Sequence, residues 1–400
     1  MKRAVLGELC DFFNGGAWSD KEYVNAGIPV LKVTNCKSTG FQLDGLNYLS
    51  EKSREKYKKN ELVIGDVIIA TVGSHPNLIE SAAGRSCIVN SQVEGFYLNQ
   101  NAVCVRTKDK KVLSQKYLGY LCKCADFQHY IQSRGRGAAN QMRIAISSIK
   151  EYSFTLPDIQ NQHYIADILS TYDDLIENNQ RQIKLLEEAA QRLYKEWFVD
   201  LRFPGHENTK IVDGVPEGWN EKTLSQVANV IMGQSPKSEF YNSEKKGLPF
   251  HQGVGSYGVR FVMDDIYSTS YTRIAEPNSI LFSVRAPVGR LNITKNKVVI
   301  GRGLAAINQT DGCQSYLYYL LKNKFFKDNI VGNGSIFASV SKDELLNQKF
   351  LIPERSLMMQ FEKIVSQMDK QIENLDSKNK KLIEARDRLL PKLMSGEVEV

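Results

Sequence analysis

LIENNQRQIKLLEEAAQRLYKEWF, residues 175–198, has the spacing of an amphipathic helix, with one polar residue, Asn179, on its apolar stripe. A second segment, QIENLDSKNKKLIEARDRLLPKLM (residues 371–394), has the same pattern, with Asn379 on its stripe. In both regions apolar residues keep alternating spacings of four and three over about four heptads, which is typical of a coiled coil. We therefore predict that the two helices pair with each other.

The two asparagines predict the direction of this pair. A parallel pair would bury each asparagine against a hydrophobic residue, and an unsatisfied buried amide costs about 1–3 kcal/mol. An antiparallel pair with coincident midpoints places Asn179 opposite Asn379, where the two amides can hydrogen-bond and fix the register. We predict the antiparallel arrangement; the alternative is that each helix packs only on its own domain. The predicted contacts are Asn179 with Asn379, Tyr172 with Arg386 (a cation–π pair), Leu186 with Ile372, and Trp197 with Phe361.

The two helices are parts of an internal repeat. FTLP at Phe154 is echoed by FLIP at Phe350, and this offset of 196 residues continues through the helices. Upstream the similarity is weaker but keeps its order. The parallel segments are VLGELCDFFNGG at Val5 with TLSQVANVIMGQ at Thr223, GDVIIATVG at Gly65 with PNSILFSVR at Pro277, and KYLGYL at Lys116 with SYLYYL at Ser315.

Short β-branched runs punctuated by Gly and Asn predict strands upstream of each long helix. The predicted fold class is α+β: two mixed α/β domains separated by an antiparallel pair of long helices (a coiled coil), related by pseudo-two-fold symmetry. The predicted boundaries are 1–157 for the first domain, 158–198 for the first long helix, 199–217 for a linker, 218–352 for the second domain and 353–396 for the second long helix.

Composition fits a protein with sizeable hydrophobic cores, because 42% of its 400 residues are hydrophobic. The net charge of +7 is unevenly distributed: residues 1–157 carry +7 and residues 201–352 carry +5, whereas residues 158–200 carry −5. Basic domains are consistent with binding to nucleic acid. No apolar run reaches the roughly 18–20 residues that a membrane span needs, and the odd number of scattered cysteines indicates reduced thiols, so we expect a cytoplasmic protein.

Motifs for catalysis are missing from the sequence. We find no N/D-PP-Y/F motif for adenine methylation, no GxxxxGK[ST] phosphate loop and no HExxH. GVGSYG, residues 253–258, matches GxGxxG, but the following VRFVMDD predicts a strand rather than a helix, so a glycine-rich turn is favoured over a nucleotide site. The five histidines have no metal-ligand spacing. We therefore predict no catalytic residue, no metal site and no bound cofactor in this chain.

The chain resembles the specificity subunit (HsdS) of type I restriction-modification systems. The resemblance covers the whole chain and rests on the repeated F-x-L/I-P entry to each helix, the YDDLIENNQRQI and MDKQIENLDSKNKKL helix cores, the EWFVDLRFPG…VPEGW connector, the GQSP loop at Gly233 and the terminal LLPKLMSG. It implies two target recognition domains that read the halves of a bipartite, asymmetric DNA site, with helix length setting the spacer. It also implies a non-catalytic role beside two methyltransferase subunits, which use S-adenosylmethionine to methylate adenine. Two restriction subunits, which use ATP and magnesium, complete the implied complex.

Polar and basic residues in glycine-rich loops are the predicted DNA contacts. Arg and Lys suit guanine edges and phosphates, whereas Asn and Gln suit adenine edges. In the first domain the candidates are Asn35, His75, Arg85, Arg134, Arg136, Gln141 and Arg143; in the second they are Ser235, Lys237, Gln252, Tyr257, Arg285, Arg290 and Arg302.

Two other interpretations stay open at this stage. One is a specificity subunit of a related system whose partner fuses methylation and cleavage in one chain, which the neighbouring reading frames would decide. The other is a coiled-coil adaptor whose end domains bind proteins, and weak, salt-insensitive affinity for DNA would favour it.

Overall fold

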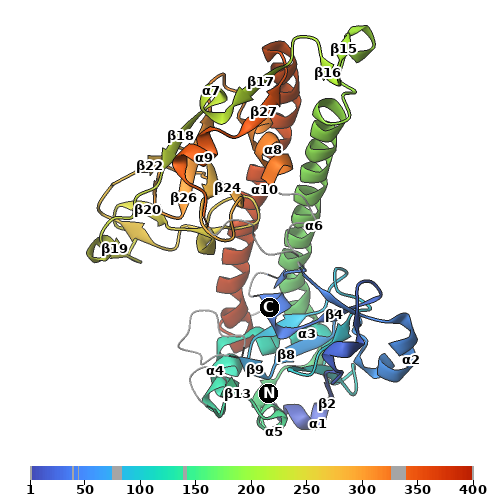
Figure 1. The fold of residues 1–400 in the computed structure, drawn as a ribbon. Helices are drawn as coiled ribbons and strands as arrows, with labels where there is room; N and C mark the ends of the chain where they lie inside the picture. The colour runs from blue at the N-terminus through green and yellow to red at the C-terminus, as the bar shows by residue number, and fades with distance from the viewer. Residues whose placement is uncertain are drawn as a thin grey trace. The chain divides into compact units, whose positions relative to one another are not determined.

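The computed structural model describes residues 2–37, 40–43, 45–73, 83–137, 142–325 and 339–398. The chain forms two compact units. Unit 1 contains Met1–Asn178 and Lys378–Val400, and unit 2 contains Asn179–Ser377. Two long helices, α6 (Ile159–Phe198) and α10 (Arg355–Ser395), each contribute to both units (Figure 1). None of the described helices is long and apolar enough to cross a bilayer.

Unit 1 has two four-stranded sheets, with helices α3 (Gln115–Lys123) and α4 (Ala125–Ser133). The first sheet is antiparallel, in the order β10 (Ser86–Ile88), β8 (Val67–Ala70), β12 (Ala102–Thr107) and β2 (Cys10–Asn14). The second has the order β11 (Tyr97–Leu98), β4 (Ile28–Leu31), β7 (Asn47–Leu49) and β3 (Tyr23–Val24), with β11 parallel to β4. Its smaller elements are β1 (Lys2–Val5), β14 (Ser153–Leu156), β5 (Cys36–Lys37), β6 (Gly40–Phe41), β9 (Val72–Gly73), β13 (Met142–Arg143), α1 (Leu6–Leu9), α2 (Arg54–Tyr57) and α5 (Ile146–Lys150).

Unit 2 repeats this architecture. Its antiparallel sheet has the order β18 (Ala228–Met232), β26 (Leu304–Gln309), β23 (Ile280–Ser283) and β24 (Leu291–Ile293). Its second sheet has the order β19 (Tyr241–Asn242), β21 (Tyr267–Ser268), β20 (Leu248–His251), β25 (Val298–Ile300) and β22 (Ile274–Ala275), with β20 parallel to β25. The remaining elements are α7 (Leu224–Val227), α8 (Gln314–Phe325), α9 (Lys342–Leu346), β15 (Ile211–Val212), β16 (Val215–Pro216), β17 (Asn220–Thr223) and β27 (Lys349–Ile352).

The apolar sequences of β8 and β23 explain why these two strands lie in the interior of their sheets. Every residue of β8 and of β23 is buried, because each strand lies inside its sheet and is covered on both faces. Continuous apolar runs such as VIIA and ILFS are typical of strands in that position. The two main cores of the molecule form on these sheets, one in each unit, and each also contains residues of both long helices.

Two glutamines confirm the internal repeat in detail. In unit 1, Gln115 at the start of α3 accepts a hydrogen bond from Thr107 N at 2.8 Å. In unit 2, Gln314 at the start of α8 accepts the same bond from Gln309 N at 2.8 Å. In each case a polar side chain ties the first turn of a helix to the end of the strand before it. The parallel predicted between KYLGYL and SYLYYL is therefore correct.

One predicted alignment is wrong by a single residue. The sequence parallel placed Gly65 against Pro277, but Gln115 donates to Gly65 O and Gln314 donates to Asn278 O, both at 2.9 Å. Gly65 has φ of 89° and Asn278 has φ of 65°, so each has a left-handed backbone two residues before its strand begins. Because side chains alternate between the faces of a strand, the predicted alignment matched inward with outward positions.

The long helices run in opposite directions in unit 1. Asn379 Nδ2 donates to Ile176 O at 3.5 Å, and further along α10 Arg386 pairs with Asp173, which lies earlier on α6. Residue numbers thus rise on one helix as they fall on the other. Leu390 of α10 lies in the same core cluster as the earlier α6 residues. The predicted cation–π pair is wrong: Arg386 bonds Asp173, the residue after Tyr172, rather than the Tyr172 ring.

Unit 2 has the same antiparallel sense. The Trp197 and Phe361 rings lie 6.0 Å apart at 64°, which confirms the predicted contact between the end of α6 and the start of α10. Ile372 is fully buried and Leu186 packs on the same cluster. The antiparallel direction follows from these contacts alone. The predicted Asn179–Asn379 contact would join the two units and stays a prediction.

Candidate nucleic-acid interface

Three turns of unit 2, at residues 233–235, 251–253 and 301–303, pack against one another through their backbones. Gly301 N donates to His251 O at 2.8 Å, and Gly303 N donates to Gln252 O at 3.1 Å. A Cβ atom at Gly233 would lie 2.1 Å from Gly301 O, and one at Gly303 would lie 2.4 Å from Gln252 O. These positions therefore require glycine, since a side chain would push the turns apart.

This packing brings together three predicted DNA contacts from separate motifs. Ser235 Oγ accepts a hydrogen bond from Arg302 N at 3.2 Å, and Gln252 follows directly after the carbonyl that binds Gly301. The Gln252 and Arg302 side chains are exposed, whereas Ser235 is half-buried. Unit 2 thus presents an amide and a guanidinium side chain on a rigid glycine-rich platform, which suits contacts to base edges.

Arg285 lies beside this platform. Val284 N donates to Gly303 O at 2.9 Å, and the next residue, Arg285, is exposed and forms a strand-like bridge with Ser339. Neither Arg285 nor Arg302 has an ion pair with a described residue. An exposed arginine without an acidic neighbour is available for a phosphate or a guanine.

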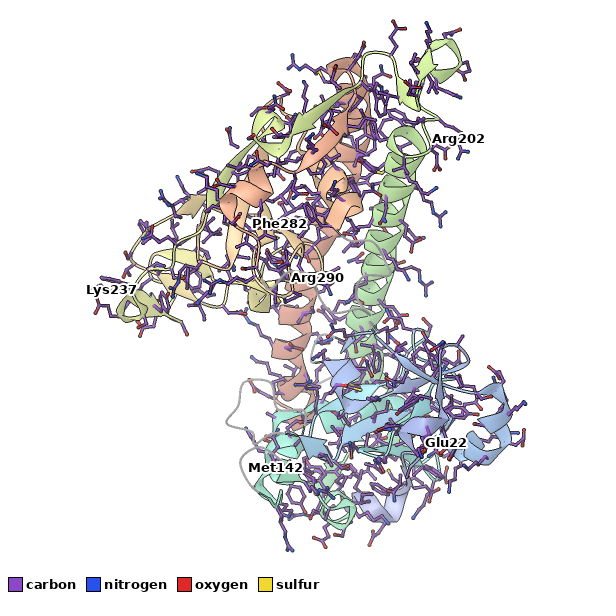
Figure 2. All side chains as sticks on the ribbon, in the orientation of Figure 1. Glu22, Met142, Arg202, Lys237, Phe282 and Arg290 are labelled. Carbon is purple, nitrogen blue, oxygen red and sulfur yellow. The ribbon has the colours of Figure 1, made fainter. Side chains whose placement is uncertain are left out.

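The other candidates of unit 2 differ in their availability. Lys237 is exposed beside β19, as Figure 2 shows, and its Nζ lies 3.8 Å from Glu239 in a solvent-accessible ion pair. Arg290 is half-buried, and its backbone N donates to Ser283 Oγ at 2.9 Å. Tyr257 donates its hydroxyl to Leu281 O at 2.9 Å, and burial raises its pKa. The hydroxyl of Tyr257 is therefore engaged inside the unit.

Unit 1 has two exposed arginines on adjacent backbone segments. Arg136 and Arg143 form an antiparallel bridge through hydrogen bonds of 2.9 and 2.8 Å. Like charges directly opposite each other on strands are destabilising. Buried Met142 holds the segment, and β13 also pairs with β9. Neither arginine has an ion pair with a described residue, so this pair suits a phosphate anion.

The remaining unit 1 candidates are mostly engaged within the fold. Arg134 lies 3.6 Å from the Tyr130 ring centroid, although its side chain is exposed. Asn35 closes a turn: its Oδ1 accepts from Lys32 N at 2.9 Å, and its Nδ2 donates to Gln42 O at 2.9 Å. Arg85 donates to Cys36 O at 2.6 Å. His75 and Gln141 lie outside the described residues.

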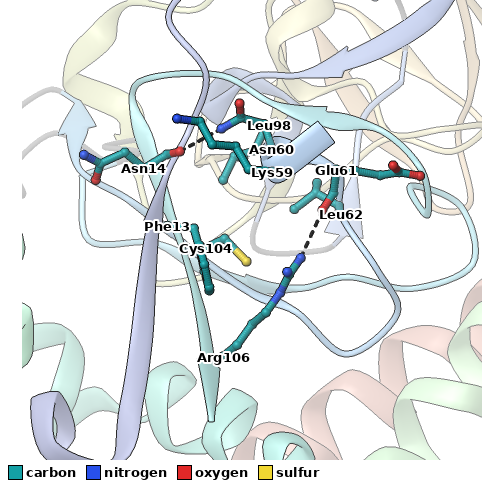
Figure 3. A pocket seen from close by; sticks show the side chains of 9 residues that line it. All are labelled: Phe13, Asn14, Lys59, Asn60, Glu61, Leu62, Leu98, Cys104 and Arg106. Carbon is teal, nitrogen blue, oxygen red and sulfur yellow. Dashed lines mark hydrogen bonds between the residues drawn. The ribbon is translucent and has the colours of Figure 1, made fainter. Parts of the chain in front are cut away.

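Two other arginines, Arg106 and Arg260, have a structural role, because each forms ion pairs with carboxylates of its own unit. Arg106 binds both oxygens of Asp66, at 2.7 and 2.6 Å, and donates to Glu61 O at 3.0 Å. Figure 3 shows Arg106 and the Glu61 carbonyl at the edge of a small surface hollow. Arg260 is 2% exposed and pairs with carboxylates on both long helices. Both guanidinium groups thus bind carboxylates of their own unit, although Nε of Arg260 has no hydrogen-bond partner.

The sequence prediction missed one turn of unit 1. Asn99–Asn101 holds the place that Gly301–Gly303 holds in unit 2, between the parallel strand of the second sheet and the central strand of the first. Its middle residue, Gln100, is exposed. The two turns share no residue, so sequence comparison does not align them. A signal was nonetheless present, since both turns immediately precede a six-residue strand whose first four residues are apolar and buried.

Comparison with known proteins identifies the family. The sequence model described as "Type I restriction modification DNA specificity domain" matches residues 1–188 and 216–385, which include both repeats. The chain belongs to this family.

Two relatives carry matching names. The type I restriction enzyme MjaIX specificity subunit of Methanocaldococcus jannaschii is 27% identical over 301 residues, covering 71% of this chain and 69% of its own. The type I restriction enzyme HindI specificity subunit of Haemophilus influenzae is 22% identical and covers 96% of both chains. The crystal structure of a type I restriction-modification system S subunit from M. genitalium has the same fold. It has a TM-score of 0.58 and 19% identity, and it covers 98% of this chain and 96% of that one.

The described residues contain no cluster of three or more His, Cys, Asp or Glu side chains that could hold a metal ion. All seven cysteines are buried free thiols. The exposed arginines and amides of the two turn regions are suited to hydrogen bonds with phosphates and base edges.

Proposed function

We propose that this type I specificity subunit reads DNA with the exposed turn region of each unit. Each recognition domain reads one half of a bipartite site, and the two halves differ because the two turn regions carry different side chains. The observation that carries the proposal is the recurrence of one platform in both repeats, each with exposed arginines that have no acidic partner among the described residues. Acidic partners would otherwise compete with phosphate for these groups.

The long helices are proposed to set the spacer and to dock methyltransferase subunits. They join the two recognition domains along the chain, so their length is available as a ruler of about 1.5 Å per residue. Leu175 and Leu185 of α6 are 46% and 59% exposed, and we propose each of them as an apolar contact for a partner protein. We propose two methyltransferase subunits, with S-adenosylmethionine as their cofactor, and two restriction subunits that use ATP and magnesium.

Adenine methylation mapping tests this function. The chain would be expressed with its methyltransferase partner in a host without other adenine methylation, and modified adenines would be located by sequencing. We expect a motif of two unlike half-sites separated by a fixed number of unspecified bases. A palindromic or uninterrupted motif would contradict the assignment of one half-site to each unit. Methylation without any motif would contradict DNA reading by this chain.

A binding measurement separates the proposal from the protein-adaptor alternative. Neutralisation of phosphates makes log K fall with log salt by about 0.9 per contact. The complex of the chain with its methyltransferase partner should therefore lose DNA affinity steeply between 50 and about 200 mM salt. Weak affinity that does not change with salt would favour an adaptor.

A further inference from the structure

The 301–303 turn of unit 2 has a counterpart in unit 1 that the backbone defines more clearly than the sequence. The donors and acceptors correspond one by one in the two units, although the side chains differ. The matched bonds are Gly15 N to Ala102 O (3.0 Å) with Gly233 N to Leu304 O (2.9 Å), Gly16 N to Leu98 O (2.7 Å) with Gln234 N to Ile300 O (2.9 Å), Asn99 N to Leu31 O (3.0 Å) with Gly301 N to His251 O (2.8 Å), and Thr71 N to Asn101 O (2.9 Å) with Val284 N to Gly303 O (2.9 Å).

Close backbone approaches give the same correspondence independently. A Cβ atom at Gly15 would lie 1.9 Å from Asn99 O, and one at Gly233 would lie 2.1 Å from Gly301 O. Both glycines follow the strand that pairs with β12 or β26 at the edge of the first sheet. Each turn thus packs against a glycine of its own unit. The backbone contacts around the middle residue of the turn are therefore the same in both units.

Those middle residues are Gln100 and Arg302. Both side chains are exposed. The neighbouring equivalent pair behaves differently, because Lys32 of unit 1 donates to Asn47 Oδ1 at 3.1 Å, whereas its counterpart Gln252 is exposed. Gln100 and Arg302 therefore share both position and accessibility.

Each turn also has an exposed arginine on the adjoining strand bridge. In unit 1, the residue after Thr71 is Val72, which pairs with Arg143. In unit 2 the equivalent bridge joins Arg285 to Ser339. Here the arginine is the equivalent of Val72, whereas in unit 1 the arginine is the residue that pairs with Val72. Each turn thus has a cation beside it that could bind a phosphate while the middle residue faces a base.

We propose that Gln100 and Arg302 are equivalent base-reading residues, one in each recognition domain. The proposal rests on the function assigned above and specifies which positions carry the reading. Glutamine pairs in a bidentate manner with adenine N6 and N7, whereas arginine pairs with guanine O6 and N7. The half-site read by unit 1 should therefore contain a required adenine where the half-site read by unit 2 contains a required guanine.

Reciprocal substitution tests this assignment in the complex of the full chain with its methyltransferase partner. Gln100→Arg should change one adenine of the first half-site to guanine, and Arg302→Gln should change one guanine of the second half-site to adenine. Each change should alter the preference at that one position by about 10- to 100-fold in methylation rate, leaving the other half-site unchanged. Lys210→Gln, at an exposed linker position, is the matched control for loss of charge and should leave the motif intact.

The outcomes separate this inference from the proposed function. If the wild-type complex gives a bipartite motif but both substitutions leave every required base unchanged, the reading role of Gln100 and Arg302 is wrong while the function stands. A uniform loss of affinity for all sequences would also overturn base reading, since it would identify phosphate contacts. Melting temperatures of both variants should equal that of the wild type, because both side chains are exposed.

Discussion

Replacing Arg260 with methionine removes a guanidinium that is 2% exposed and lies inside unit 2. Its nitrogens pair with Glu187 of α6 at 3.4 Å and with Asp369 of α10, and its guanidinium carbon lies 4.1 Å from the Tyr318 ring centroid. Loss of one partner from a buried ion pair typically costs 3–5 kcal/mol, because the other charge is left uncompensated. The two carboxylates are 19% and 21% exposed and can regain some water, so we expect about 3 kcal/mol.

The assay is thermal and denaturant unfolding of Arg260→Met beside the wild type. A loss of about 3 kcal/mol corresponds to a decrease of about 6–12 °C in the Tm of unit 2. Burial raises the pKa of Asp369, so its carboxyl takes up a proton more readily than a free aspartate. Protonation removes the unpaired charge, so the stability loss caused by Arg260→Met should become smaller as the pH falls. Adding Asp369→Asn should recover part of the stability for the same reason.

A matched control uses an ion pair at the surface of the same unit. Lys349→Met breaks a 2.7 Å pair with Glu221 in which both side chains are more than 60% exposed. Such pairs contribute about 0–1 kcal/mol, so the control should unfold close to the wild type. If Arg260→Met were no less stable than Lys349→Met, the interpretation of Arg260 as a buried structural cation would be refuted.

Three further predictions concern the helices and the DNA surface. Burial opposes ionisation of Asp173, but Lys123 and Arg386 hold its pKa below the usual 3.8. Asp173→Asn should therefore destabilise unit 1 at pH 7, and the stability difference from the wild type should narrow only as the pH falls below about 4. A difference in unfolding free energy that does not change with pH would contradict this linkage. Substituting both Arg136 and Arg143 with glutamine should lower the salt slope of DNA binding by about 2 without changing the motif, and an unchanged slope would remove them from the phosphate contacts. Asn179→Leu alone should destabilise the helix pair, whereas Asn179→Leu with Asn379→Leu should recover stability and loosen the register; additive losses in a double-mutant cycle would count against their contact.

Much of the fold was predictable because period and repetition are properties of the sequence itself. The alternating spacing of four and three placed Trp197 against Phe361, and the offset of the repeat located both long helices. The antiparallel direction was also predictable, although the Asn179–Asn379 contact on which that prediction rested stays a prediction. The strands were harder, since short apolar runs such as VIIA fit more than one alignment, and the alignment of Gly65 was wrong by one residue.

The candidate site was less predictable because composition does not say where a side chain points. Tyr257 lies in a glycine-rich turn like Gln252, yet its hydroxyl binds Leu281 O inside the unit. Arg302 follows a glycine that marks the turn, whereas its counterpart Gln100 lies between two asparagines and carries no such mark. The backbone hydrogen bonds and the close approaches at Gly15 and Gly233 show that the two positions are equivalent.

The most direct test of the central claim is to lengthen both long helices and remap the methylated sequence. Inserting one helical turn of four residues into α6 and into α10 adds about 6 Å, which equals one to two base pairs at about 3.4 Å per step. We predict that the unspecified spacer grows by one or two base pairs while both half-sites keep their bases. A spacer of unchanged length, or a change within either half-site, would contradict the role of the helix pair as the ruler between two independent reading domains.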